Sequence, residues 1–453
     1  MKRKLLPAMM LATAALMVQA HQLPKHFSSH FTNQTLRVDY YHTGNRDTDT
    51  ISLDRMYRLG IWAGPVHELT DGFNNGQYYV KVMDAASGEL IYSRGFNSYF
   101  YEYRTTDPAI RGVNRTFHET VYIPFPKKKV RLVLENRDKQ LHLQTVFAQE
   151  IDPEKDYFDT APSTGHIQVK NLAQGGHPHN CVDIALVAEG YRLEDRAKLE
   201  RDFARASEIL FNREPYRSNK SRFNLYGVFP PSRDSGCDEP RQGKYRATAV
   251  EASFNALDLP RYLLVEDNRR LQNALSRVPF DVVIVMVNHE RYGGGGIYNQ
   301  YCVFTSDSRA SAYLLLHEFG HSFAGLGDEY YSSQVSYNEF VPPGVEPLEP
   351  NVTALLDPPN LKWKEMVTPG TRIPTPWEKE LYDQLPGAKR AAHLQRQEFQ
   401  GVVGAFEGAM YASEGMYRPT IDCIMFSRNT LDYCPVCREA VMRMIFHYSG
   451  KQP

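Results

Sequence analysis

Short runs of alternating apolar and polar residues dominate the first third of the chain and predict β-strands. The runs are rich in aromatic and β-branched residues, and turn-forming stretches such as Asp71–Gly76 and Ala86–Gly88 separate them. The predicted strands are Gln77–Met83, Glu89–Arg94, His118–Tyr122 and Val130–Leu134. Several short strands at this spacing indicate an antiparallel sandwich. We therefore expect an all-β, sandwich-like N-terminal domain over residues 21–160.

From Val182 onward the pattern changes to apolar strands that alternate with helical segments. The predicted elements are a strand at Val182–Val187, a helix at Leu193–Leu210, and strands at Asn224–Phe229, Phe280–Val287 and Tyr301–Thr305. This order of strand, helix and strand predicts an α/β (α+β) domain over residues 165–453. The proline-containing, acidic segment Gln149–Ser163 is the expected linker between the two domains.

The first twenty residues have the pattern of a secretory signal peptide. A basic start at Met1–Lys4 precedes an apolar run at Leu5–Val18, and Val18–Ala20 offers a small-x-small cleavage site. No later segment reaches the roughly 18–20 apolar residues of a membrane-spanning helix. We expect residues 1–20 to be removed and the mature protein, starting near His21, to be exported to the periplasm or the medium without membrane insertion.

The overall composition is that of an ordinary globular protein. Apolar residues make up 42% of the chain and charged residues 23%. The net charge of −1 gives no reason to propose a nucleic acid or an anionic membrane as a partner. No pattern in the chain predicts its oligomeric state.

The segment Leu314–Tyr331, LLLHEFGHSFAGLGDEYY, carries the strongest chemical signal. Apolar residues at helical spacing give it a buried face, and His317 and His321, four residues apart, point to one place in space. Zinc binds such imidazole nitrogens, and a catalytic site leaves one position open beside its protein ligands. Glu318 adjoins the first histidine and can act as general base on a water in that position.

A third ligand is expected from the turn that follows this helix. Gly325 and Gly327 allow the chain to leave the helix through positive φ. A turn at this point would bring the Asp328 carboxylate back to the metal. Glu329 is the alternative, because a small change in the turn would present its carboxylate instead.

The helix motif resembles that of the metzincin zinc peptidases, HExxHxxGxxH or HExxHxxGxxD, with one extra residue before the glycine. The spacing from glycine to acidic residue is preserved, which favours Asp328 as third ligand. Metzincins also carry a methionine in a tight turn beneath the metal, and Met425 in the Cys-Ile-Met segment is the candidate for that turn.

The segments HEFGHSFAGLGDEY, YRPTIDCIM and CPVC together resemble the IgA-peptidase family of secreted bacterial metalloendopeptidases. The resemblance covers roughly Ile167 to the C-terminus. It implies a metzincin-like catalytic domain and a secreted zinc endopeptidase that acts on a protein or glycoprotein. It does not imply immunoglobulin A as the substrate of this chain.

One zinc ion is expected to act with a glutamate base. Zinc lowers the pKa of a bound water to about 7, and Glu318 would take the proton as the water attacks the scissile carbonyl, then pass it to the leaving amine. Tyr417 and Tyr433 flank the methionine turn, and each is a candidate donor to the developing oxyanion. The expected metal ligands are His317, His321 and Asp328.

Two further segments are expected to shape the cleft. In metzincins the strand comparable to Tyr301–Thr305 pairs with the substrate backbone, and the glycines at Gly293–Gly296 would either let a peptide approach closely or form a flexible surface loop. The proline-rich segment Pro342–Lys389 is long and irregular, so we expect it to wall the cleft. Trp363 and Trp377 within it are expected to be packing anchors.

Two other functions are compatible with the helix motif. The chain would be an exported binding or adhesion module if its metal were purely structural, or a zinc hydrolase of a non-peptide amide such as a glycan-linked one. Glu318 argues against the first, because a structural site closes its fourth position and needs no base.

The chain has six cysteines, and in an exported protein they favour disulfides over free thiols. Six cysteines allow fifteen pairings, which the sequence does not distinguish. The Cys434-Pro-Val-Cys437 motif also permits a redox role or a second, structural zinc site. Cys423 is a nearby disulfide partner, so we expect cross-linking.

Overall fold

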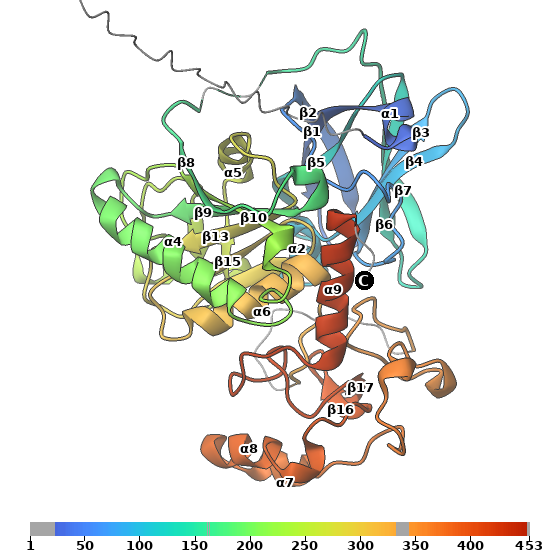
Figure 1. The fold of residues 1–453 in the computed structure, drawn as a ribbon, viewed down its shortest axis with the longest axis vertical. Helices are drawn as coiled ribbons and strands as arrows, with labels where there is room; N and C mark the ends of the chain where they lie inside the picture. The colour runs from blue at the N-terminus through green and yellow to red at the C-terminus, as the bar shows by residue number, and fades with distance from the viewer. Residues whose placement is uncertain (1–22, 161, 163, 332–343, 451–453) are drawn as a thin grey trace, which may run out of the picture.

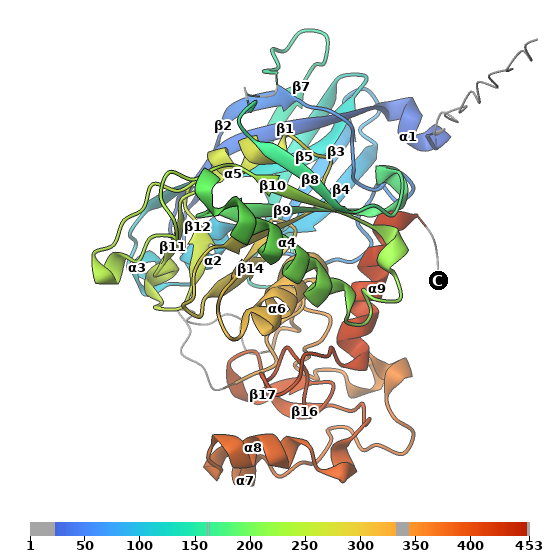
Figure 2. The same cartoon turned by 60° about the vertical axis from the view of Figure 1, so that its left-hand side comes forward.

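The computed structural model describes residues 23–160, 162, 164–331 and 344–450. The expected signal peptide, residues 1–20, lies outside these residues. A β-rich N-terminal part lies beside a mixed sheet with helices, and short helices and a hairpin near the C-terminus extend beyond them (Figures 1 and 2). This is an α+β architecture, as the sequence indicates. Among the described residues, no helix has both the length and the apolar character needed to cross a membrane.

The N-terminal part consists of two antiparallel sheets that pack face to face. One has the strand order β2-β1-β5 and the other β4-β3-β6-β7. Apolar residues of both sheets, among them Val38, Tyr40, Val80 and Leu132, share one core. The elements are α1 (Lys25–His30), β1 (Phe31–Gly44), β2 (Asp49–Arg58), β3 (Tyr78–Asp84), β4 (Leu90–Phe96), α2 (Tyr99–Arg104), α3 (Asp107–Ile110), β5 (Arg115–Pro126), β6 (Val130–Arg137) and β7 (Leu143–Ile151).

The predicted N-terminal strands correspond to β3, β4, β5 and β6, whereas β1, β2 and β7 were not predicted. β1 is the clearest case, because polar residues within it are buried and disrupt the alternation that marks a half-buried strand. Arg37 and Asp39 are both fully buried and form an ion pair at 2.6 Å. In the sequence, two charged residues so close together indicate a polar loop and not a buried strand.

The second part is organised around a six-stranded sheet with the order β14-β15-β13-β9-β10-β8. The four central strands are parallel, and the edge strands β8 and β14 run antiparallel to their neighbours. Its elements are β8 (Gln168–Ala173), β9 (Val182–Glu189), α4 (Arg196–Phe211), β10 (Phe223–Phe229), β11 (Ala252–Phe254), β12 (Leu263–Val265), α5 (Asn268–Leu275), β13 (Val282–Val287), β14 (Gly294–Ile297), β15 (Tyr301–Thr305) and α6 (Ser311–Ala324). β9, β10, β13, β15 and α4 match the predicted elements.

Helices cover both faces of this sheet because alternate residues of each central strand point to opposite sides. In β9, Ile184 and Leu186 pack with α4 and α6, while Ala185 and Val187 pack with α5. Burial on both faces explains the continuous apolar run in β13 and the largely apolar β9, in which Asp183 and Glu189 are also buried. It also places α6 against β15 and β14; Figure 1 shows α6 beside β15, and Figure 2 shows it beside β14.

The glycine-rich segment is an edge strand, β14, and not a surface loop. It pairs with β15, so β15 is an inner strand and its edge is not free for a substrate. A Cβ atom on Gly296 would lie 2.5 Å from the Glu318 carbonyl oxygen and 2.9 Å from His321 Cβ, and one on Gly294 would lie 3.0 Å from the Glu318 side chain. The glycines therefore allow the strand to approach α6 closely.

The C-terminal part returns the chain to α6. Its elements are α7 (Lys379–Gln384), α8 (Gly387–Leu394), the hairpin β16 (Phe406–Ala409) and β17 (Ala412–Arg418), and α9 (Pro435–Ser449). α9 packs against α6 (Figure 1). Trp363 is buried and donates to the Gly404 carbonyl at 2.7 Å, and Trp377 donates to the Glu407 carbonyl at 3.1 Å. Both tryptophans are packing anchors in the structure.

The N-terminal and central parts are joined by polar contacts beside the β14–β15 turn. Arg94 donates to Asn299 Oδ1 at 2.8 Å and to the Tyr448 hydroxyl at 2.7 Å. Asn299 in turn donates to the Gly95 carbonyl at 2.7 Å, and the Asn97 amide donates to the Tyr298 carbonyl at 2.9 Å. These bonds fix the second sheet of the N-terminal part next to the end of α6.

Candidate metal centre

Helix α6 positions the predicted metal-binding residues from within the core. Its apolar side chains are buried, and the helix ends at Gly325, whose φ of 61° lies in the left-handed region that glycine adopts without strain. The Gly325 amide donates to the His321 carbonyl at 3.1 Å and the Leu326 amide to the Gly320 carbonyl at 3.3 Å. This C-terminal cap turns the chain back along the helix and brings Asp328 beside the two histidines.

Three ligand atoms converge in an almost equilateral triangle. His317 Nε2 lies 3.2 Å from His321 Nε2, and Asp328 Oδ1 lies 3.1 Å from the first and 3.2 Å from the second. Zinc bonds of about 2.0–2.1 Å at the tetrahedral angle place ligand atoms roughly 3.3 Å apart. The spacing of the triangle is therefore that of three corners of a zinc tetrahedron.

Both imidazoles are held in one orientation by backbone carbonyls. His321 Nδ1 lies 2.6 Å from the Leu326 oxygen, and His317 Nδ1 lies 3.0 Å from the Ile424 oxygen. A carbonyl can only accept, so each Nδ1 carries the proton and each Nε2 presents its lone pair to the centre. The Tyr313 ring stacks on His317 at 4.9 Å between centroids.

Asp328, and not Glu329, faces the histidines. Asp328 Oδ2 accepts a hydrogen bond from the Tyr411 hydroxyl, while Oδ1, the atom at the centre, is buried without a hydrogen-bond partner. Burial alone would raise the pKa of Asp328, but the two imidazoles hold it well below its usual range. The Glu329 carboxylate lies elsewhere, where its Oε1 accepts from Asn351 Nδ2 at 2.9 Å and lies 3.1 Å from Cys437 Sγ.

Glu318 lines the same cavity as the histidines and Asp328. Its side chain is 9% exposed, and burial raises its pKa, an effect that His317 and His321 partly offset. A carboxylate in such a site is a stronger base than one in water. The position suits a group that takes a proton from a water near the triangle.

Both parts of the chain contribute to the walls of this cavity. Asn75, Gln77 and Asn97 come from the N-terminal part, and Leu348 and Glu349 come from the segment predicted to wall the cleft. Residues 332–343, which include the start of that segment at Pro342, lie outside the described residues. The cavity therefore has walls on at least two sides of the candidate metal site.

The two tyrosines predicted as oxyanion donors lie elsewhere. The Tyr433 hydroxyl is buried under α6, donates to the Leu316 carbonyl and lies 3.2 Å from the Tyr216 hydroxyl. The Tyr417 hydroxyl lies 3.4 Å from Glu407 Oε1. Neither lines the cavity, because Tyr433 packs on the core side of α6 and Tyr417 lies in β17.

Met425 lies in a turn directly beneath α6. The Phe426 and Ser427 amides both donate to the Cys423 carbonyl at 2.9 Å, which closes the turn. The Met425 thioether is fully buried, and a Cβ atom on Gly320 would lie 3.1 Å from its sulfur. Gly320 thus provides the space in which the sulfur packs between the two histidine positions of the helix.

Three cavity residues were not predicted from the sequence. Tyr411 binds Asp328, and the Tyr330 ring lies parallel to His317 at 6.3 Å between centroids. Arg261 also lines the cavity. Its position could not be predicted from the sequence, because it follows a proline in an irregular segment that matches no motif. Of the three, Tyr330 is the easiest to predict from the sequence, because it directly follows the acidic pair at the end of the motif.

The structure contains none of the expected disulfides. All six cysteines lie in the described part of the chain, where each is buried and none forms a disulfide. Cys423 and Cys437 have their sulfurs 3.8 Å apart, whereas a disulfide bond is about 2.05 Å long.

Comparison with protein families gives two matches that together span most of the chain. A family described as IgA Peptidase M64 matches residues 170–445, and one described as Peptidase M64 N-terminus matches residues 26–148. No curated protein matches the chain.

Proposed function

Because the chain belongs to the IgA peptidase M64 family and is therefore a peptidase, we propose that it is a zinc-dependent endopeptidase of protein or glycoprotein substrates. The observation that carries the proposal is the triangle of His317 Nε2, His321 Nε2 and Asp328 Oδ1, with edges of 3.1–3.2 Å. The partnerless Asp328 Oδ1 supports it, since a bound cation would satisfy this buried oxygen.

The donor set suits zinc. Two neutral imidazoles and one carboxylate are among its usual ligands, and three protein ligands leave a fourth position open. When bound, the ion would act as a Lewis acid on the scissile carbonyl and would make a water acidic enough to ionise near neutral pH. The same arrangement of helix, turn and methionine supports a metzincin-like catalytic domain.

Glu318 would move the proton. Its carboxylate takes a proton from the attacking water as the water oxygen bonds to the scissile carbon. It then gives that proton to the amide nitrogen as the carbon–nitrogen bond breaks, so one carboxylate serves both steps. The buried, water-poor position of Glu318 favours this role because it keeps the pKa of the base above its usual value.

Tyr330 is our proposed donor to the developing oxyanion. It lines the cavity, its ring lies parallel to the His317 ring, and its hydroxyl is held beside the triangle by hydrogen bonds with Asp328 and Arg261. The Tyr411 hydroxyl also donates to Asp328. Tyr417 and Tyr433, the earlier candidates, face other partners. A preorganised hydroxyl at this position would stabilise negative charge in the transition state.

The N-terminal part would form one wall of the substrate cleft, and we propose that it is a separate domain. The two family matches leave residues 149–169 between them, which includes the predicted linker Gln149–Ser163. Asn75, Gln77 and Asn97 line the cavity, and a side-chain amide can both donate to and accept from a peptide backbone. The Gln77 amide already donates to Asn136 Oδ1 and to the Arg137 carbonyl, so Asn75 and Asn97 are the candidates for such contacts. Export through the signal peptide of residues 1–20 would place this cleft outside the cytoplasm, and sequencing of the mature N-terminus, expected near His21, tests it.

The test compares Glu318→Gln with wild type in peptide-library cleavage and bound metal. Glu318→Gln keeps the shape of the side chain and removes the base, so zinc should stay bound while turnover falls by a factor of about 10²–10⁴. Glu194→Gln, a substitution at an exposed glutamate, should keep wild-type turnover. Wild-type turnover in zinc-loaded Glu318→Gln would refute the assigned role. Absence of cleavage by zinc-loaded wild type on all peptides would favour a binding module or a hydrolase of another amide.

A further inference from the structure

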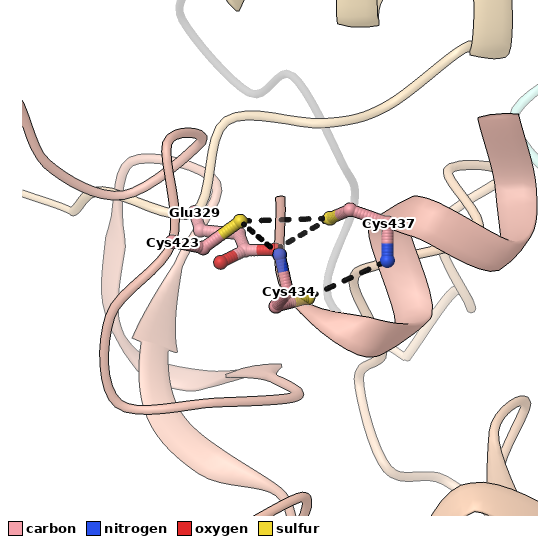
Figure 3. A group of neighbouring side chains, drawn as sticks. All are labelled: Glu329, Cys423, Cys434 and Cys437. Atoms are coloured by element: carbon pink, nitrogen blue, oxygen red, sulfur yellow. Dashed lines mark hydrogen bonds between the residues drawn. The ribbon is translucent and has the colours of Figure 1, made fainter. Parts of the chain in front are cut away.

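A second group of metal-ligating side chains lies on the far side of the turn that follows α6. Cys423, Cys434, Cys437 and Glu329 point toward one another (Figure 3), and their ligand atoms all lie within 4.8 Å. Each is buried, and none belongs to the triangle described above. The four come from three separate segments: the strand-like exit from α6, the methionine turn and the start of α9.

The distance between two of the sulfurs matches a tetrahedral thiolate site. Cys423 Sγ and Cys437 Sγ lie 3.8 Å apart, and Cys437 Sγ lies 3.1 Å from Glu329 Oε1. Zinc–sulfur bonds of about 2.3 Å at the tetrahedral angle place two sulfurs roughly 3.8 Å apart. The sulfurs therefore have the separation of two ligands of one ion and are too far apart for a disulfide.

Backbone amides are aimed at two of the sulfurs. The Cys434 amide lies 3.2 Å from Cys423 Sγ, and the Cys437 amide lies 3.4 Å from Cys434 Sγ. The second contact forms where α9 begins, so Cys434 caps the helix with its own sulfur. Amide donors to sulfur stabilise the thiolate form, which is the form that binds a metal.

Glu329 provides an observation that is independent of the cysteines. Its side chain is fully buried, and Oε2 has no hydrogen-bond partner. Oε1 accepts from Asn351 Nδ2 at 2.9 Å, and Asn351 also bonds both the amide and the carbonyl of Gly327. A buried carboxylate that is oriented by a buried amide, with Oε1 3.1 Å from Cys437 Sγ and Oε2 without a hydrogen-bond partner, is poised to bind a cation.

We propose that Cys423, Cys434, Cys437 and Glu329 form a second, structural metal site that binds zinc. Three soft thiolates and one carboxylate in a closed tetrahedron favour zinc over the hard cations calcium and magnesium, which prefer oxygen ligands. The protein supplies all four ligands, so a tetrahedral ion bound here has no open position for a substrate. The site is structural and not catalytic.

This ion would stabilise the two segments that position Asp328 and His317. Glu329 directly follows Asp328, and Cys423 precedes Ile424, whose carbonyl orients His317. Binding of one ion by both segments would fix the third catalytic ligand and the methionine turn relative to each other. This consequence rests on the proposed function, whereas the presence of the second ion does not.

The test exploits the fact that the His317, His321 and Asp328 site contains no sulfur. Full-length protein is purified under reducing conditions, and its metal content is measured with zinc and after replacement by cobalt. We expect two zinc ions per wild-type chain and, with cobalt, the near-ultraviolet charge-transfer absorption of cobalt–thiolate bonds. His321→Ala should lose one ion and keep this absorption, so failure of the catalytic site and failure of the second site are told apart.

Cys434→Ser should lose the thiolate absorption and one zinc per chain. Cys237→Ala is the matched control, because it removes a buried free thiol far from the group in sequence and should keep both ions. Should Cys434→Ser fail to fold, X-ray absorption of the single zinc in His321→Ala decides, with a sulfur distance of about 2.3 Å expected. Lack of cobalt–thiolate absorption in wild type, a disulfide among the three cysteines by mass spectrometry, or a zinc without sulfur ligands would overturn the proposal.

Discussion

The close approach of β14 to α6 makes Gly296 the position at which the smallest change should do most harm to the metal centre. An added Cβ would meet the Glu318 carbonyl oxygen at 2.5 Å and His321 Cβ at 2.9 Å. Both atoms belong to the helix backbone or its first side-chain carbon, so no rotamer change relieves the clash. In Gly296→Ala, helix and strand must separate.

The expected cost has two components. Overpacking of this kind costs about 1–3 kcal/mol of unfolding free energy. Displacement of a ligand and of the base by about 1 Å costs on the order of 10²-fold in rate. We therefore expect kcat/KM to fall about 100-fold at temperatures where the protein is still folded, together with weaker zinc binding.

Two controls separate this effect from the general effect of adding a methyl group. Gly387→Ala, at the start of α8, has no atom within 4 Å of the new Cβ and should leave stability and rate almost unchanged. Gly295→Ala directs its Cβ toward Leu264 and Tyr262, on the other face of the strand, so it should destabilise while zinc affinity is kept. The measurements are urea unfolding, zinc titration against a competing chelator and peptide cleavage. A Gly296→Ala protein that matches Gly387→Ala in all three would refute the reasoning.

Two further predictions concern buried polar contacts. Tyr411→Phe removes the hydrogen bond to Asp328 Oδ2, so zinc affinity in a chelator competition should fall about 10–100-fold, and an unchanged affinity would contradict the role given to Tyr411. In the N-terminal part, burial alone would lower the pKa of His42, but Glu119 and Asp49 raise it from 6.5 to about 9. The protonated histidine therefore stabilises the fold fully below pH 6.5, and its contribution, on the order of 3 kcal/mol, should be lost as the pH rises to about 9. Urea unfolding of wild type and His42→Gln should converge over this range, and a stability difference that stays constant with pH would show that the ionised histidine is not responsible.

Strands buried on two faces and the metal helix were predictable from the sequence. β13 is a continuous apolar run and β9 and β15 are largely apolar, and the His317–His321 spacing is informative because it needs only helical geometry. β1 was not predictable in this way, because a buried ion pair within it hides the strand pattern. The glycines of β14 were compatible with a close approach of a peptide or with a flexible loop. Their close contact with α6 is formed only in the tertiary structure, so the sequence does not reveal it.

The choice between Asp328 and Glu329 also depended on tertiary structure. Their order along the chain is compatible with either ligand, whereas the fold places the Asp328 carboxylate beside the two histidines and the Glu329 carboxylate beside Asn351. Tyr411 lies far along the chain from Asp328, in a tight turn where its φ is 65°, so no local pattern links the two. Oxyanion donors cannot be selected by proximity to a motif, as the positions of Tyr417 and Tyr433 show.

The cysteines illustrate a different limit. Export favours disulfides, and the Cys434–Cys437 spacing is shared by redox motifs and zinc sites, so the sequence favours cross-linking on general grounds. The decisive feature is the carboxylate of Glu329, which lies more than ninety residues before the first of its sulfur neighbours along the chain. Only the fold brings it to them.

The most direct test of the central claim is a zinc-edge anomalous difference map from crystals of the zinc-loaded protein. If His317, His321 and Asp328 bind zinc, we expect a peak about 2.0–2.2 Å from His317 Nε2, His321 Nε2 and Asp328 Oδ1. We expect a second peak, from the structural zinc, among the three cysteine sulfurs and Glu329. Zinc-loaded crystals without a peak between His317, His321 and Asp328 would contradict the central claim.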